Sequence, residues 1–333
     1  MAKFSLYDRF TEGGTVSDPD GVPDPRYALP STVNWMRAYA ILIEDENLDF
    51  QKASRFYHGI SKTKLTEQQE NSIFEHLLLA IHQLAALRAM ARVKPQADVA
   101  RVASVAWHYG IYAAVTAMIA AQDGSVQDNH TKTANTWDRQ FTSSGKIPHP
   151  FDLRVSTLVK KDAEVEIDGF RRGPKANLVN RPATTDDAHQ AICGYLSGTR
   201  AWWAWRVEEE LKRSAEFRQL GVLDFRTKAA RNLRDTRLAK QCISFAHQAI
   251  RFRGKANYRE ALYLAHGRTV ESAVSEFTAD MADILEAFTA LAGAFCFKRL
   301  GPQLRDDFLT DLDKYKSFSI DPKDIWSYSL SPL

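Results

Sequence analysis

The sequence predicts an all-α protein, and three observations support this fold class. Apolar residues recur at spacings of three and four over several long segments, which is the pattern of helices with one buried face. Cap residues and Gly-Pro pairs mark where these segments begin and end. Only residues 146–182 alternate apolar with polar residues, and there we expect a small β-hairpin inserted into a helical bundle. With 333 residues and 44% hydrophobic residues, the chain can bury a substantial core.

The charges nearly balance, with 44 Lys and Arg against 41 Asp and Glu. Any attraction to nucleic acid must therefore come from a local patch and not from the overall field. The cysteines are odd in number and widely separated, which suits reduced core thiols of a cytoplasmic protein. They are Cys193, Cys242 and Cys296.

No uninterrupted apolar run reaches the length of a membrane span, so we expect no membrane association. The nearest approach, Val99 to Ala121, is interrupted by Arg101 and His108. The first residues also lack the apolar stretch of a secretory signal.

In chain order, residues 1–31 are rich in Gly, Asp and Pro and predict an irregular N-terminal arm. Residues 32–145 form the first part of the bundle. It should contain one or two helices over Thr32–His58 and a helix from the capping-box pattern at Thr66 to Lys94-Pro95. Residues Asp98–Gln122 are apolar on nearly every side, which predicts the central helix, and Asp123-Gly124 should end it.

Two features of this first part have alternative interpretations. His108 lies on the central helix, where a hydrogen-bonded core histidine is more common than a ligand. The following segment, SVQDNHTKTANTW at 125–137, is dense in polar groups. It either binds a ligand or caps the next helix.

Residues 146–182 predict the insertion. Phe151–Val155 and Val165–Ile167 alternate around a turn at Lys160–Asp162, which gives the β-hairpin. The basic segment GFRRGPKANLVNRP at 169–182 follows, and it either touches a phosphate backbone or is a solvated loop.

Residues 183–301 form the second part of the bundle. A strong N-terminal signal at Thr184 starts a helix to Lys212, and Thr236–Arg268 is predicted as one long helix. A final helix over Val270–Phe297 ends at Gly301-Pro302, and residues 302–333 form a short, partly ordered C-terminal tail.

The long helix predicted at 236–268 has two distinct faces. Small and apolar residues, Gly254 among them, form a stripe that should let another helix pack closely. The opposite face is basic, since Arg251, Lys255 and Arg259 follow one another at intervals of four. These like charges need an acidic partner. It is either a carboxylate of another helix or a phosphate of a nucleotide or RNA.

Four segments together resemble HEPN domains, the helical domains of many prokaryotic toxins and defence proteins. They are HYGIYAAVTAMIAAQDGS at 108–125, HTKTANTW at 130–137, RGKANY at 253–258 and the final amphipathic helix. The resemblance covers roughly residues 74–137 and 238–300. It implies an HEPN-like bundle and a metal-independent RNase site in which Arg is followed by His, as in Arg259 and His266, completed across a homodimer.

The resemblance also suggests how phosphate would be held. The residues for that role are Arg251, Arg253, Lys255 and Tyr258. A related Arg-to-Tyr pattern spans Arg251–Tyr258, but Ala256 stands where a catalytic His would be.

An Arg and His pair needs neither metal nor cofactor, because Arg neutralises the charge of the transition state while His transfers a proton. On a regular helix Arg259 and His266 would be about 10 Å apart, so two chains would have to combine their residues. The expected function is an RNA-cleaving effector of a toxin or antiphage defence system. The alternative is a non-catalytic subunit that binds nucleotide, nucleic acid or a cognate protein partner. The sequence contains no P-loop, HExxH, GxSxG or zinc-spaced Cys/His motif.

Overall fold

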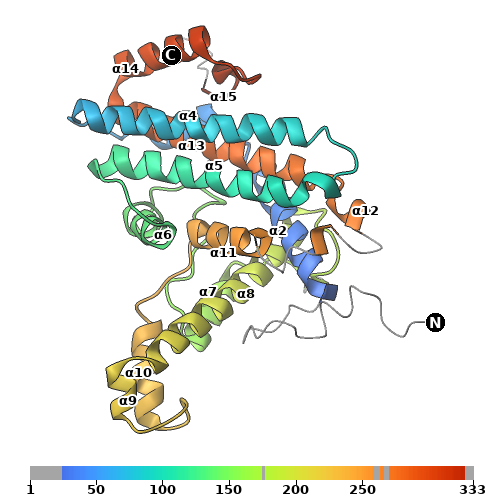
Figure 1. Cartoon of the computed structure of the whole chain (residues 1–333), viewed down its shortest axis with the longest axis vertical. Coiled ribbons are helices and arrows are strands. Elements are labelled where there is room, and N and C mark those ends of the chain that lie inside the picture. Colours follow the sequence, from blue (N-terminus) through green and yellow to red (C-terminus); the bar gives the residue numbers. More distant parts are fainter. Residues whose placement is uncertain (1–24, 175–176, 258–262, 266–269, 327–333) are drawn as a thin grey trace.

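Three long helices lie side by side at the centre of the molecule (Figure 1). They are α4 (Glu67–Met90), α5 (Ala97–Asp123) and α13 (Phe277–Leu300). The computed structural model describes residues 25–174, 177–257, 263–265 and 270–326. Within these residues the chain is helical with no named strand, so the all-α prediction is confirmed.

Shorter helices cover both sides of this central layer (Figure 1). One side carries α14 (Pro302–Tyr315) and α15 (Pro322–Trp326). The other side carries α2, α6 and α11, and α8 leads away from the bundle to α9 and α10. The bounds of the remaining helices are α2 (Pro25–Asp45), α3 (Phe50–Phe56), α6 (His130–Trp137), the π-helix η1 (Asp138–Thr142), α7 (Lys160–Gly169), α8 (Thr185–Lys212), α9 (Ala215–Gln219), α10 (Lys228–Leu238), α11 (Phe245–Asn257) and α12 (Val270–Val274).

The predicted helix boundaries are most accurate where capping residues define them. Thr66 and Gln69 form a capping box at the start of α4, and Thr184 and Asp187 form another at α8. Gly124 ends α5 in the left-handed conformation, with φ of 76°. These helices therefore begin and end close to where the sequence predicts.

Aromatic side chains join α2, α5, α8 and α11 into one core. The Trp35 ring stacks on Tyr195 with centroids 4.4 Å apart, and it meets Trp107 edge-on at 5.6 Å. Its indole N–H donates to Gln248 Oε1 at 3.1 Å, which satisfies the polar atom that burial of Trp would otherwise leave unpaired. This core fixes α11 against α5.

The C-terminal helices close the other side of the core. Trp326 is 1% exposed and its indole N–H donates to the Thr289 carbonyl on α13 at 3.1 Å. The ring occupies the space beside Gly293, where an added Cβ would lie 2.4 Å from Trp326 Nε1. The 302–326 part of the expected tail is thus two helices, and α15 packs directly onto α13.

The predicted β-hairpin at 146–182 is wrong. Residues Lys160–Gly169 form α7, because Ala163 and Ile167 are spaced for one helix face and are both buried. Val165, which the hairpin would have placed in a strand, is 69% exposed. Val155 instead makes an isolated antiparallel bridge with Ile243, with both N–O distances at 2.8 Å.

The same bridge breaks the long helix predicted at 236–268. Ile243 is extended, so α10 ends at Leu238 and α11 begins only at Phe245. The close packing expected at Gly254 is also wrong, since a Cβ added there would meet nothing within 4 Å. The buried face of α11 carries larger residues, among them Phe245 and Phe252.

Smaller differences concern the two ends and the last long helix. The predicted irregular arm extends to residue 31, but α2 begins at Pro25, and residues 1–24 lie outside the described part. The expected helix over Val270–Phe297 is divided into α12 and α13. The three cysteines are free, as expected.

By length and composition, α4 and α5 are apolar enough to cross a membrane. This is not evidence for a span, because core helices pass the same test. In the most apolar window of α5, 72% is buried inside the molecule.

Candidate functional site

Most of the residues predicted for the site cannot be placed. Arg259, Tyr258 and His266 lie outside the described residues. Lys255 belongs to α11, but its side chain is outside the described part as well. Arg251 and Arg253, both on α11, are described.

Arg251 is held by an aromatic ring. Its guanidinium lies 4.5 Å from the ring centroid of Trp202 on α8, and Arg206 lies 5.1 Å from the same ring. Such a cation–π contact stabilises both partners by about 0.5–1 kcal/mol at exposed sites. The two arginines therefore share one Trp, and the phosphate-binding role predicted for Arg251 remains a prediction.

Arg253 meets two histidines, and we call His108, His130 and Arg253 the His–Arg cluster. Arg253 NH1 lies 3.4 Å from His130 Nε2, and His130 Nδ1 lies 3.4 Å from His108 Nε2. His108 Nδ1 lies 3.1 Å from the Ala249 carbonyl on α11. Three helices thus supply one connected chain of polar atoms.

Local structure explains the position of each histidine. His130 is the first residue of α6, whose N-cap Asn129 accepts a hydrogen bond from the Lys132 amide at 2.8 Å. His108 lies on the face of α5 that packs against α11, and it is 2% exposed. The prediction that His108 is a hydrogen-bonded core residue is confirmed.

The hydrogen-bond directions in the His–Arg cluster follow from the groups at its two ends, the Ala249 carbonyl and the Arg253 guanidinium. The Ala249 carbonyl can only accept, so Nδ1 of His108 carries a proton and, in the neutral ring, Nε2 accepts. His130 must then donate through Nδ1 and accept from Arg253 through Nε2. One tautomer of each histidine therefore satisfies the whole chain, although both 3.4 Å contacts are long.

The electrostatics keep both rings neutral. Burial, the other histidine and the Arg253 guanidinium lower the pKa of His108 to about 3. Burial and the same guanidinium lower the pKa of His130. His130 is only partly buried, so it can meet a solute as an uncharged proton acceptor beside a fixed cation.

Two tyrosines of α5 flank His130. The Tyr112 ring centroid is 4.3 Å from that of His130, and the Tyr109 centroid is 5.9 Å away. Tyr109 is 41% exposed. The exposed Tyr109 ring can stack a nucleic-acid base, and the Arg253 guanidinium, which contacts the same histidine, can bind a phosphate.

A second polar network near α6 has the residue types of a hydrolase triad but not its accessibility. Ser244 Oγ lies 2.9 Å from His247 Nδ1, and His247 Nε2 lies 2.9 Å from Asn135 Oδ1. Ser244 is fully buried, and burial lowers the pKa of His247 to about 4. A substrate cannot reach this serine, so the network serves to fix the start of α11 against α6.

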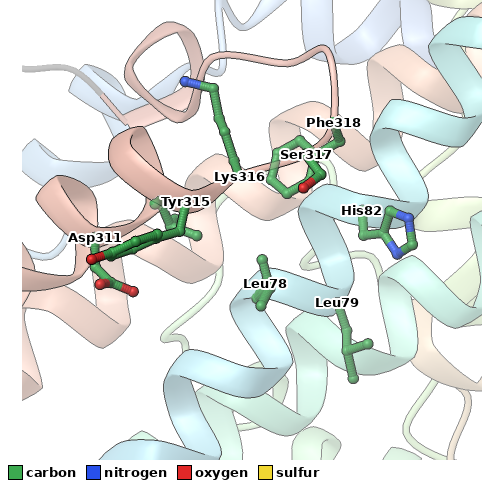
Figure 2. Close-up of a pocket in the computed structure, with 9 residues that line it drawn as sticks. Leu78, Leu79, His82, Asp311, Tyr315, Lys316, Ser317 and Phe318 are labelled. Atoms are coloured by element: carbon green, nitrogen blue, oxygen red, sulfur yellow. The ribbon is translucent and has the colours of Figure 1, made fainter.

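A cavity of about 390 Å³ lies elsewhere, between α4 and the end of α14 (Figure 2). Leu78, Leu79 and His82 face Tyr315 and Phe318 across it. It lies across the central helix layer from α6 and α11, and it contains none of the residues of the His–Arg cluster (Figure 1). Its lining is mostly apolar, with His82, Asp311 and Lys316 at its rim.

The basic segment at 169–182 is tied to the protein surface. Arg171 donates to Gln190 Oε1 at 2.8 Å and to Asp168, while Arg181 pairs with Glu276. Within the described residues, no group of three His, Cys, Asp or Glu is arranged to hold a metal ion. The His–Arg cluster is therefore the strongest candidate site in that part of the chain.

Searches of protein-family models, curated proteins and solved structures find no match to this chain. The candidate site therefore depends on geometry alone. Sequence reasoning predicted Arg253 as a phosphate ligand, which stays a prediction, and missed its contact with His130. The available signal was the polar segment at 125–137. Its capping alternative is confirmed by Asn129, the N-cap of α6, and its ligand-binding alternative stays a prediction.

Proposed function

We propose that this protein is an HEPN-like effector that cleaves RNA without a metal ion, as part of a toxin–antitoxin or antiphage defence system. The observation that carries the proposal is the partly buried His130, which has the Arg253 guanidinium on one side and the His108 ring on the other. Neutral imidazole beside a fixed cation is what phosphodiester cleavage by acid–base catalysis requires.

In this mechanism Arg253 binds a non-bridging phosphate oxygen and stabilises the charge that grows in the transition state. His130 Nε2, released from its long contact with Arg253, accepts the proton of the 2′-hydroxyl, whose oxygen then attacks phosphorus as the bond to the 5′-oxygen breaks. The 5′-oxygen leaves with a proton from solvent water, and the His130 imidazolium returns its proton to solvent. His108 holds the His130 ring through Nδ1, and it acts as a positioning residue because it is buried.

A bound phosphate also changes the proton affinity of His130. The Arg253 guanidinium contributes to the lowered pKa of His130, and a phosphate at Arg253 opposes that effect. The imidazole therefore takes up a proton more readily once substrate is present. Proton transfer from the hydroxyl is coupled to binding in this way.

The resemblance to HEPN domains adds Arg259 and His266 to the proposal. These two residues would complete the site across a homodimer, together with Lys255 and Tyr258 as phosphate ligands. Size-exclusion chromatography with light scattering tests the dimer directly. We propose that the protein acts in the cytoplasm.

A second candidate is a non-catalytic HEPN-like subunit that binds nucleotide, nucleic acid or a partner protein within a larger complex. The observation that favours it is that both ring nitrogens of His130 are already engaged. In that case the His–Arg cluster stabilises the junction of α5, α6 and α11 and offers Arg253 as an anion ligand.

Incubation of purified protein with total RNA in the presence of EDTA separates the candidates. We expect cleavage by the wild type, and a loss of about 100-fold or more in rate for His130→Ala. The exposed His58→Ala is the matched control and should cleave normally. His266→Ala, assayed in parallel, tests the residue from the HEPN resemblance.

The outcomes are distinct. Cleavage that persists in both His130→Ala and His266→Ala discards both site assignments. If the wild type does not cleave but binds nucleotide in a manner that depends on Arg253, the non-catalytic subunit is the better description.

A further inference from the structure

The positive charge of the chain is concentrated in one projection. Residues 212–240, which we call the basic arm, contain α9 and α10 and extend from the end of α8, away from the central helices (Figure 1). They include nine Lys or Arg and three Asp or Glu. The rest of the chain has 35 basic and 38 acidic residues, so the net charge of +3 arises entirely from this arm.

The basic arm has a small apolar centre of its own. Phe217 is 3% exposed and its ring centroid is 4.9 Å from that of Phe225. The Arg234 guanidinium covers Phe225 at 5.7 Å and reaches Glu208 of α8 at 3.8 Å. The arm is thus a folded support that holds its surface charges at fixed places.

The acidic residues of the arm neutralise only part of this charge. Asp224, Glu216 and Asp235 each pair with an arginine of the arm, and Lys212 pairs with Glu209 of α8. Five further cations of the arm have no carboxylate partner among the described residues, and all five are exposed. They are Arg213, Arg218, Lys228, Arg231 and Lys240.

Cation–π contacts link α11, the helix that carries Arg253, to α8 and so to the basic arm. Arg251, two residues before Arg253, lies against Trp202, and Arg206 lies against both Trp202 and Trp203. From Trp202, α8 continues into the basic arm, with Arg213 about 17 Å further along its axis. The cations Arg251, Arg206 and Arg213 therefore follow one another from α11 along α8 to the basic arm, beside the partly buried Trp202.

We infer that the basic arm binds the phosphodiester backbone of RNA whose scissile linkage lies at His130. This inference rests on the proposed function and adds a preference for RNA long enough to reach both places. Phosphate is the favoured ligand because most of the arm cations are arginines, which bind phosphate through two parallel N–H donors. The path past Trp202 also suits a chain of bases better than a compact acidic protein.

The test uses RNA binding by a protein that does not cleave. In a His130→Ala background, Lys228, Arg231 and Lys240 are all changed to Ala, and the affinity for a fluorescent RNA of about 20 nucleotides is measured over a range of salt concentrations. We expect the dissociation constant to rise about tenfold at low salt. The slope of log affinity against log salt should fall by about 2, because each lost phosphate contact removes about 0.7.

The matched control removes three exposed cations from a different part of the surface. Lys64, Arg92 and Lys94 lie in the segments that flank α4, and their change to Ala should leave the salt slope as it was. A fluorescent oligonucleotide of about three nucleotides should bind equally to all variants, since it cannot reach the arm. Circular dichroism confirms that each variant is folded.

An unchanged affinity and slope in the arm variant overturns the inference. It is also overturned if polyglutamate or phosphatidylserine vesicles bind the arm as tightly as RNA does, because the arm then recognises negative charge of any kind. If the wild type does not cleave RNA but the arm variant loses RNA affinity, the arm assignment stands and the cleavage proposal fails.

Discussion

Acidification should destabilise this protein through His108, and the size of the effect follows from its burial. The folded protein lowers the pKa of His108 from 6.5 to about 3. The unfolded chain therefore binds a proton as the pH falls below about 6.5, while the folded protein does so only near pH 3. The contribution of His108 to stability is complete above pH 6.5 and is lost progressively between these two values.

The free-energy change can be worked out for about pH 5. That pH is about 1.5 units below the unfolded pKa, and each unit corresponds to about 1.4 kcal/mol, so His108 accounts for a loss of about 2 kcal/mol. His247, whose pKa is lowered to about 4 by burial, adds a similar amount. Substitution of His108 by Gln, which keeps a donor for the Ala249 carbonyl, should remove only the first of these contributions.

Urea unfolding at about pH 7.5 and about pH 5 measures the difference for each variant. We expect the wild type to lose about 2 kcal/mol more than His108→Gln between these conditions. His58→Gln removes one exposed histidine and should lose as much as the wild type. An equal pH dependence in wild type and His108→Gln would refute the reasoning, because the buried ring would then not be the group that takes up the proton.

Other predictions concern packing and capping. Gly293→Ala should destabilise the protein by about 1–3 kcal/mol in urea unfolding, because the added Cβ overlaps the Trp326 ring. Gly198→Ala, at an exposed position of α8 with nothing within 4 Å, should instead stabilise it by about 0.5–1 kcal/mol, and a loss there would contradict the explanation. Thr66→Ala should lower the free energy of unfolding by about 1 kcal/mol, since it removes the capping box of α4, while Thr66→Ser should retain most of it.

The starts and ends of helices were predictable from the sequence where nearby residues determine them. The caps at Thr66 and Thr184 and the stop at Gly124 involve neighbouring residues only, so they are visible in the sequence. The β-hairpin prediction was wrong because Val155 pairs with Ile243, which is distant along the chain. Periodicity cannot detect such pairing, and the same bridge ended the long helix that the sequence predicted.

The candidate site was predictable only in part, for a related reason. Arg253 was predicted through the resemblance of its own segment to HEPN domains, whereas its partners come from positions 108 and 130 on two other helices. Each histidine taken alone is typical of a core or a cap. Their contact with each other and with Arg253 becomes apparent only when the packing of α5, α6 and α11 is known.

The contact between Trp326 and Gly293 has a consequence for how the protein is made. Ribosomes synthesise the chain from the N-terminus, so α13 emerges before the side chain that fills the space beside Gly293. Until Trp326 arrives, the surface of α13 beside Gly293 lacks the ring that covers it and is open to chaperones or to aggregation. The native packing of α13 is therefore complete only after the ribosome has synthesised Trp326.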